Sequence, residues 1–165
     1  MDWLWDLLAH EAFRGAVILL GVVVAIVSVL TARSTARKKQ AADMLFASRG
    51  DQGLQEGCRT VKSLHEAPGK NLRTLLGDEE HKKEISQIMY VLNHFETVCV
   101  GIKNGIYDEA MIKDAWCSMM LNTYDYSLPV VEAVRQKHGK NTLFQEYEHL
   151  VVRWKKNPIA TRKAW

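Results

Sequence analysis

Hydrophobic and polar positions divide the chain into one long uncharged stretch and a series of helical stripes. Residues 15–32 hold no charged side chain, and valine, isoleucine and leucine predominate on every side of a helix drawn through these 18 residues. Such a helix would rise about 27 Å, close to the roughly 30 Å hydrocarbon core of a bilayer. The pattern predicts a transmembrane helix at 15–32, because the rest of the chain is too small to enclose so apolar a helix as a buried core element.

The charges on either side of this stretch predict its orientation. The segment before it is acidic, and four bases follow it closely: Arg33, Arg37, Lys38 and Lys39. An excess of lysine and arginine marks the cytoplasmic side, whereas a cleaved signal peptide would begin with a basic segment. We therefore expect a retained anchor with residues 1–14 outside as an amphipathic segment, and Trp3 and Trp5 in the aromatic belt of the outer interface.

After residue 32 the apolar positions recur at helical spacing, and no stretch alternates as a strand would. The membrane helix is expected to continue to about Arg49 and to break at residues 50–53. Further helices are predicted over 54–65, from Asp78 to residues 101–105, from Asp108 to 120, from Pro129 to His138, and over 143–154.

The fold class that follows is all-α. A single amino-terminal transmembrane helix leads into a basic juxtamembrane helix at 33–53 and a cytoplasmic helical bundle at 54–156, and residues 157–165 form a basic tail. Between two bundle helices, Gly105 is expected to close the first helix and Asp108 to cap the second.

Composition and motifs argue against most kinds of chemistry. The net charge of +3 is mild, and the three cysteines are too few and too scattered for a disulfide framework. No metal-ligand spacing, nucleophile motif or phosphate-binding glycine loop occurs. We therefore expect no catalytic residue, no metal, no cofactor, no nucleic acid and no small-molecule substrate.

One carboxylate stands in an unexpected position. Glu96 falls in the middle of an apolar helical stripe, and a buried carboxylate must be paired, hydrogen-bonded or neutral. Arg135 lies on the apolar side of its own helix, and Asn93 lies one turn before Glu96. These residues are predicted to meet as a buried polar cluster, either as a structural ion pair or as a pocket built around Glu96.

The carboxyl-terminal segment mixes bases with tryptophans. Lys155, Lys156 and Trp165 are candidates for contacts with a partner or with the inner leaflet.

Several of these residues also carry a resemblance. Leu92-Asn93-His94-Phe95-Glu96, then Gly101-Ile102-Lys103-Asn104-Gly105-Ile106-Tyr107-Asp108-Glu109, then Arg135, then Phe144-x-x-Tyr147-x-x-Leu150-x-x-x-Trp154 resemble a family of small bacterial and phage proteins, the domain of unknown function number 4760. The resemblance spans roughly residues 15–156. It implies one amino-terminal membrane helix, a basic stop and a helical cytoplasmic domain, but it supplies no reaction, cofactor or substrate.

The expected function is binding. The chain is interpreted as an inner-membrane interaction protein that binds or regulates a membrane protein, or copies of itself, at the cytoplasmic face. A role in phage infection or in defence against it rests on analogy with the family alone. Two alternatives stay open: a structural accessory subunit of a larger membrane complex, and an enzyme with a pocket around Glu96.

Overall fold

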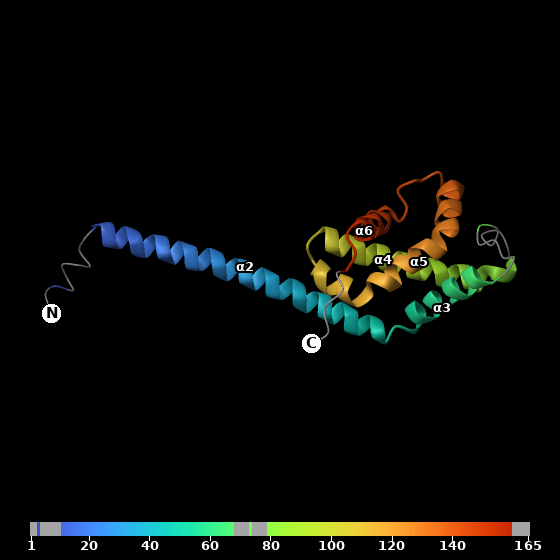
Figure 1. The fold of residues 1–165 in the computed structure, drawn as a ribbon, viewed down its shortest axis with the longest axis horizontal. Coiled ribbons are helices and arrows are strands. Elements are labelled where there is room, and N and C mark those ends of the chain that lie inside the picture. The colour runs from blue at the N-terminus through green and yellow to red at the C-terminus, as the bar shows by residue number, and fades with distance from the viewer. Residues whose placement is uncertain (1–2, 4–10, 68–72, 74–78, 160–165) are drawn as a thin grey trace.

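The computed structural model describes residue 3, residues 11–67, residue 73 and residues 79–159, and within them every regular element is helical. The elements are α2 (Glu11–Arg49), α3 (Gln52–Glu66), the short 3₁₀ helix η2 (Glu79–His81), α4 (Lys82–Lys103), α5 (Glu109–His138) and α6 (Gln145–Lys156). Figure 1 shows α2 projecting far beyond a bundle formed by the other helices. This arrangement confirms the predicted all-α fold with one long apolar helix near the amino terminus.

The helix α2 has two halves with different surroundings. In the apolar half, residues 13–32, the large side chains between Val17 and Leu30 are 51–68% exposed, and every residue from 14 to 32 is exposed. In the docked half, residues 33–49, Ala41 is completely buried and Ser48 is nearly so. By length and composition α2 could serve as a membrane anchor or a signal sequence.

Side-chain and glycine caps set the ends of the bundle helices where the sequence indicated them. The Asp108 carboxylate accepts a hydrogen bond from the Met111 backbone N–H at 2.9 Å and so caps α5. Gly105 has φ +65°, and the carbonyls of Gly101 and Ile102 accept hydrogen bonds from the N–H groups of Ile106 and Gly105. This is the glycine-closed helix end expected at Gly105, a position where a side chain would be strained.

The core lies between α3, α4, α5 and α6. Helix α3 approaches α4 closely because Gly57 lacks a side chain: a Cβ there would lie 2.2 Å from the Val91 side chain. Farther along the bundle, Phe95, Tyr147 and Trp154 are essentially buried, and the Tyr147 hydroxyl donates to the Met120 carbonyl at 2.6 Å. The bundle therefore holds a continuous hydrophobic core that does not include the apolar half of α2.

One predicted boundary is wrong. Pro129 was expected to begin a helix, but it lies inside the single 30-residue helix α5. Proline cannot donate the usual backbone hydrogen bond, at a cost of about 3 kcal/mol in a helix interior. Burial of Ser127, Val130 and Val131 on the same helix offsets that cost. Figure 1 shows α5 bending in its orange, carboxyl-terminal part, and proline is an ordinary cause of such a bend.

Two further predicted helix boundaries lie at His138 and Asp78. The predicted helix end at His138 is confirmed, because α5 ends there with an exposed His138 and Gly139 follows as its left-handed C-cap. The predicted helix start at Asp78 lies outside the described residues.

Candidate functional site

Glu96 caps a helix from outside that helix. Its two carboxylate oxygens accept hydrogen bonds from the backbone N–H groups of Glu146, at 3.2 Å, and Tyr147, at 2.7 Å. These N–H groups belong to the first turn of α6, whose own N-cap residue, Phe144, has φ +57° and provides no side-chain cap. A negative charge is favourable at a helix amino terminus, so Glu96 of α4 fixes where α6 begins.

Arg135 holds the same segment from α5. Its guanidinium donates to the Leu143 carbonyl at 2.9 Å and to the Glu148 carboxylate at 2.7 Å, and its side chain is 15% exposed. The predicted direct contact between Glu96 and Arg135 is therefore wrong, because each residue binds a different part of residues 143–148. Asn93 is exposed, so its predicted place in a buried cluster is wrong as well.

A polar cleft of about 410 Å³ adjoins this segment, between α4, α6 and the start of α5. Its charged side chains are paired with one another. Lys103 contacts Glu146 at 2.6 Å, and Glu109 receives both Arg153 and the Trp154 indole N–H at 2.9 Å. Because these contacts are internal, the cleft joins helices of the bundle and leaves little unsatisfied charge for a ligand.

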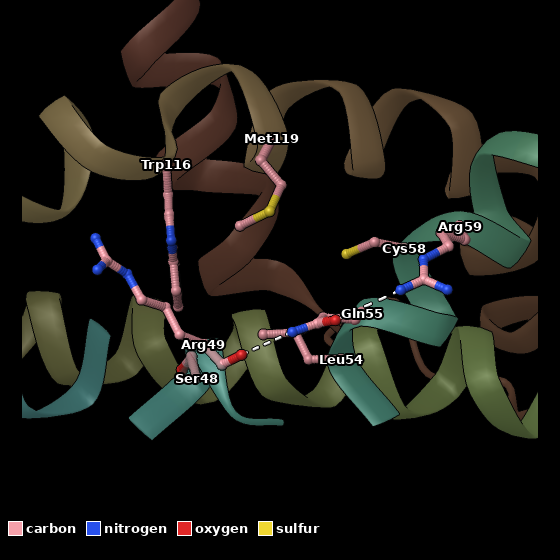
Figure 2. A pocket seen from close by; sticks show the side chains of 8 residues that line it. All are labelled: Ser48, Arg49, Leu54, Gln55, Cys58, Arg59, Trp116 and Met119. Carbon is pink, nitrogen blue, oxygen red and sulfur yellow. Dashed lines mark hydrogen bonds between the residues drawn. The ribbon is translucent and has the colours of Figure 1, made fainter. Parts of the chain in front are cut away.

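A second cleft lies where α2 meets the bundle (Figure 2). It has a volume of about 370 Å³, and three helices line it. Helix α2 contributes its last two residues, α3 the following turns, and α5 two large side chains. The lining residues are Ser48, Arg49, Leu54, Gln55, Cys58, Arg59, Trp116 and Met119.

The floor of this junction cleft is apolar and both ends are basic. Figure 2 shows Trp116 extending from α5 toward the end of α2 and Met119 pointing into the cleft, with Arg49 and Arg59 at opposite sides of the opening. Gln55 lies between them: its amide nitrogen donates to the Arg49 carbonyl at 2.7 Å, and its oxygen accepts from Arg59 at 3.4 Å. Within the part of the chain that the structure describes, neither guanidinium forms an ion pair.

His94 contacts two of the residues that line the junction cleft. His94 of α4 lies 3.4 Å from the Ser48 hydroxyl, and its ring centroid is 6.0 Å from that of Trp116. Burial lowers the pKa of His94 below its ordinary value, and the nearby charge of Asp51 opposes that effect. His94 therefore favours its neutral form, in which one ring nitrogen donates a hydrogen bond and the other accepts one.

Asp51 fixes the start of α3 beside the cleft. Its carboxylate accepts hydrogen bonds from the Tyr90 hydroxyl at 2.7 Å and from the Leu54 backbone N–H at 2.9 Å. The Tyr90 hydrogen bond is the largest cause that lowers the pKa of Asp51. The turn between α2 and α3 is thus tied to α4, and the cleft walls are fixed relative to one another.

Cys58 lines the cleft without the features of a nucleophile. Burial raises the pKa of its thiol, against a smaller opposite effect of Thr123. A raised pKa keeps the thiol protonated at neutral pH, and the thiolate is the reactive form. Cys58 therefore serves as an apolar part of the floor.

The predicted membrane-interface residues are accessible where they are described. Trp3 is 68% exposed, and the bases that follow the apolar half are all exposed: Arg33, Arg37, Lys38 and Lys39. Arg37 also covers the turn between α4 and α5, because a Cβ at Gly105 would lie 3.2 Å from its guanidinium. Trp5 lies outside the described residues.

The predicted partner contacts near the carboxyl terminus have different outcomes. Lys155 forms an ion pair with Asp125 at 2.6 Å, and Lys156 is exposed. Trp165 lies outside the described residues.

The family described as a domain of unknown function, DUF4760, matches residues 15–154. The chain belongs to this family. The DUF4760 match begins inside the apolar half of α2 and ends at the buried Trp154 of α6, so it includes the apolar helix together with the bundle. No match to the chain was found among curated proteins or among solved structures.

Sequence reasoning missed the junction cleft of this DUF4760 domain. Trp116 and Met119 lie on the helix predicted from Asp108 to 120, and both are only partly buried. Arg49 and Arg59 were not singled out, because exposed arginines are common on helices. The available signal was the predicted break at residues 50–53, where the chain changes direction between α2 and α3, which both contact α5.

Proposed function

We propose that this protein is a single-span membrane-anchored interaction protein, with its amino terminus outside and its helical bundle on the cytoplasmic side of a bacterial inner membrane. The observation that carries the proposal is the exposed apolar half of α2, which continues without interruption into the docked half. So much apolar surface needs a nonpolar environment, and its length suits a bilayer core.

Two observations support retention of the helix over its removal as a signal sequence. The same helix that carries the apolar half packs on the bundle through Ala41 and Ser48. The family match also includes the apolar residues from 15 onward. The orientation rests on the exposed bases that follow the apolar half, since lysine and arginine favour the cytoplasmic side.

Binding is favoured over catalysis by the contacts that the polar side chains make. Glu96, the residue around which an enzyme pocket was considered, uses both carboxylate oxygens to hold α6. The junction cleft instead offers apolar surface and two guanidiniums that form no ion pair with any residue the structure describes, which suits recognition of another protein. A structural accessory subunit would use the same surfaces, and the mass of the extracted species separates it from a regulator.

The test uses the full chain in its native membrane. Protease added to intact spheroplasts should leave the bundle uncut, and lysis should expose it. Extraction in mild detergent followed by native mass measurement should give a species heavier than the 18.8 kDa chain, either with a partner or as a homo-oligomer. A chain that stays dispersed without detergent contradicts the anchor. A bundle cut in intact spheroplasts contradicts the orientation, and a lone monomer contradicts the interaction.

A further inference from the structure

Two features of the junction cleft are available to a partner: partly exposed apolar side chains and two arginines. Its floor exposes part of Trp116 and Met119, although both side chains are large and apolar. Its two arginines form no ion pair within the described part of the chain. An apolar depression between unpaired guanidiniums is complementary to an apolar side chain flanked by carboxylates.

An exposed aromatic extends this surface at the end of α2. Phe46 is 64% exposed although it lies in the docked half, and the Arg49 guanidinium carbon lies 5.2 Å from its ring centroid. Arginine and aromatic residues are enriched at the centres of protein interfaces. Phe46 and Arg49 therefore form one edge of a continuous surface that leads into the cleft.

The position of the cleft excludes the bilayer as its occupant. Arg49 follows Ala32, the last residue of the apolar half, by 17 helical residues, which corresponds to about 25 Å. The polar headgroup region extends only about 5–8 Å beyond the hydrocarbon core. The cleft consequently faces the aqueous phase, where a protein segment can reach it.

We infer that the junction cleft binds an acidic segment of a partner protein, which inserts a bulky apolar side chain over Trp116 and Met119 and places carboxylates against Arg49 and Arg59. This inference rests on the proposed function and names the chemistry of the partner. A volume of about 370 Å³ is near the lower end of small-ligand pockets, roughly 300–1,000 Å³, so the cleft accepts one or two side chains and not a whole helix.

A peptide array tests the inference with the full chain in nanodiscs of neutral lipid. The array consists of octapeptides with a central pair of bulky apolar residues, and their flanks are acidic, neutral or basic. Acidic flanks should bind at least about tenfold more tightly than neutral flanks, and basic flanks should bind least. Replacing the central pair by serines should reduce binding of the acidic peptides by at least about tenfold.

Charge reversal in the protein makes the test specific. The double variant Arg49→Glu/Arg59→Glu should invert the preference toward basic flanks, and Arg49→Gln/Arg59→Gln should abolish it. Lys62→Glu reverses an exposed charge on α3 that does not line the cleft, and it should leave the preference unchanged. Unchanged helical content and thermal unfolding of each variant show that the fold is intact.

The possible failures have separate meanings. If no peptide is retained, or if the charge reversals leave the preference unchanged, the inference is wrong. If the reversals instead break self-association of the chain, the occupant is a second copy and the acidic partner is wrong. In either case the native mass of the wild-type species still decides whether the protein works by binding.

Discussion

The two halves of α2 share one unbroken helical backbone but differ in what covers them. Between Val17 and Leu30 the large apolar side chains are more than half exposed. In the docked half Ala41 is fully buried, Ser48 lies against His94, and the outward positions carry bases. The apolar half has the composition of a protein core but is exposed. The docked half has one buried side and one polar side, as an ordinary amphipathic helix does.

This difference shows that the side chains, and not the helix itself, indicate the environment of each half. A helix satisfies its own backbone hydrogen bonds and can pass from water into lipid without a change of geometry. Because no break separates the two halves, any tilt of the apolar half is transmitted to the bundle. The junction cleft therefore has a defined height and direction relative to the membrane that we propose.

The largest expected effect comes from charging the apolar half. Val23→Arg/Val27→Arg places two arginines near the middle of the proposed span, at a cost of about 2.5–3.5 kcal/mol each, or roughly 5–7 kcal/mol together. The variant should move from the carbonate-resistant membrane fraction to the soluble or aggregated fraction. Since the large side chains of the apolar half are more than half exposed, the melting of the bundle should not change.

The control for this variant places the same charge beyond the apolar half. Ala36→Arg/Ala47→Arg uses exposed positions of the docked half and should leave the membrane fraction unchanged. Equal loss of both variants from the membrane would remove the distinction between the two halves.

The next effect concerns the attachment of the docked half to the bundle. Ala41 is fully buried, so Ala41→Leu overpacks the interface and should lower the free energy of unfolding of the bundle by about 1–3 kcal/mol. Ala36→Leu adds the same atoms at an exposed position and should have little effect. Denaturant titration of the full chain in detergent micelles measures both, and equal stability would show that the docked half is not held by this contact.

A smaller effect is expected inside the bundle. Glu96→Gln keeps one oxygen acceptor but loses the charge and the second acceptor at the start of α6, at a cost of about 1–2 kcal/mol. Glu132→Gln changes an exposed carboxylate on α5 and serves as the matched control. The same titration should place Glu96→Gln below the control. A stability equal to the control would mean that the cap contributes nothing.

The smallest effect is a pH dependence at the junction. The pKa of His94 is lowered by burial from its ordinary value of 6.5, so the unfolded chain binds a proton before the folded chain does. Stability from this residue is complete above pH 6.5 and falls as pH decreases through that value toward the folded pKa. His94→Gln should therefore show a weaker loss of stability between pH 7.5 and pH 5.5 than the wild type. Parallel curves for the two proteins would contradict the assignment.

Local signals predicted much of the fold. The apolar stretch, the end of α2 at Arg49, the Gly105 turn and the Asp108 cap follow from residues close in sequence. Pro129 was misplaced because burial on both sides of it outweighs the local cost of proline in a helix. The anomaly of Glu96 was recognised correctly, but its partners are backbone groups 50 and 51 residues away, which no side-chain pattern reveals.

The junction cleft could not be predicted for a related reason. Its lining comes from three helices, and each residue alone is ordinary: an arginine at a helix end, a tryptophan on a partly packed face. Only the packing of α2 and α3 on α5 brings Arg49, Arg59 and Trp116 around one space.

The central claim is that the apolar half of α2 lies in lipid while the docked half lies in water. Nitroxide labels at Val23→Cys or Ala47→Cys, in a full chain whose three native cysteines are replaced by alanine and which is reconstituted in bilayers, report this directly by power-saturation electron paramagnetic resonance. We predict that the label at 23 collides mainly with oxygen and the label at 47 mainly with a water-soluble nickel complex. Equal access of the nickel complex to both labels would contradict the claim.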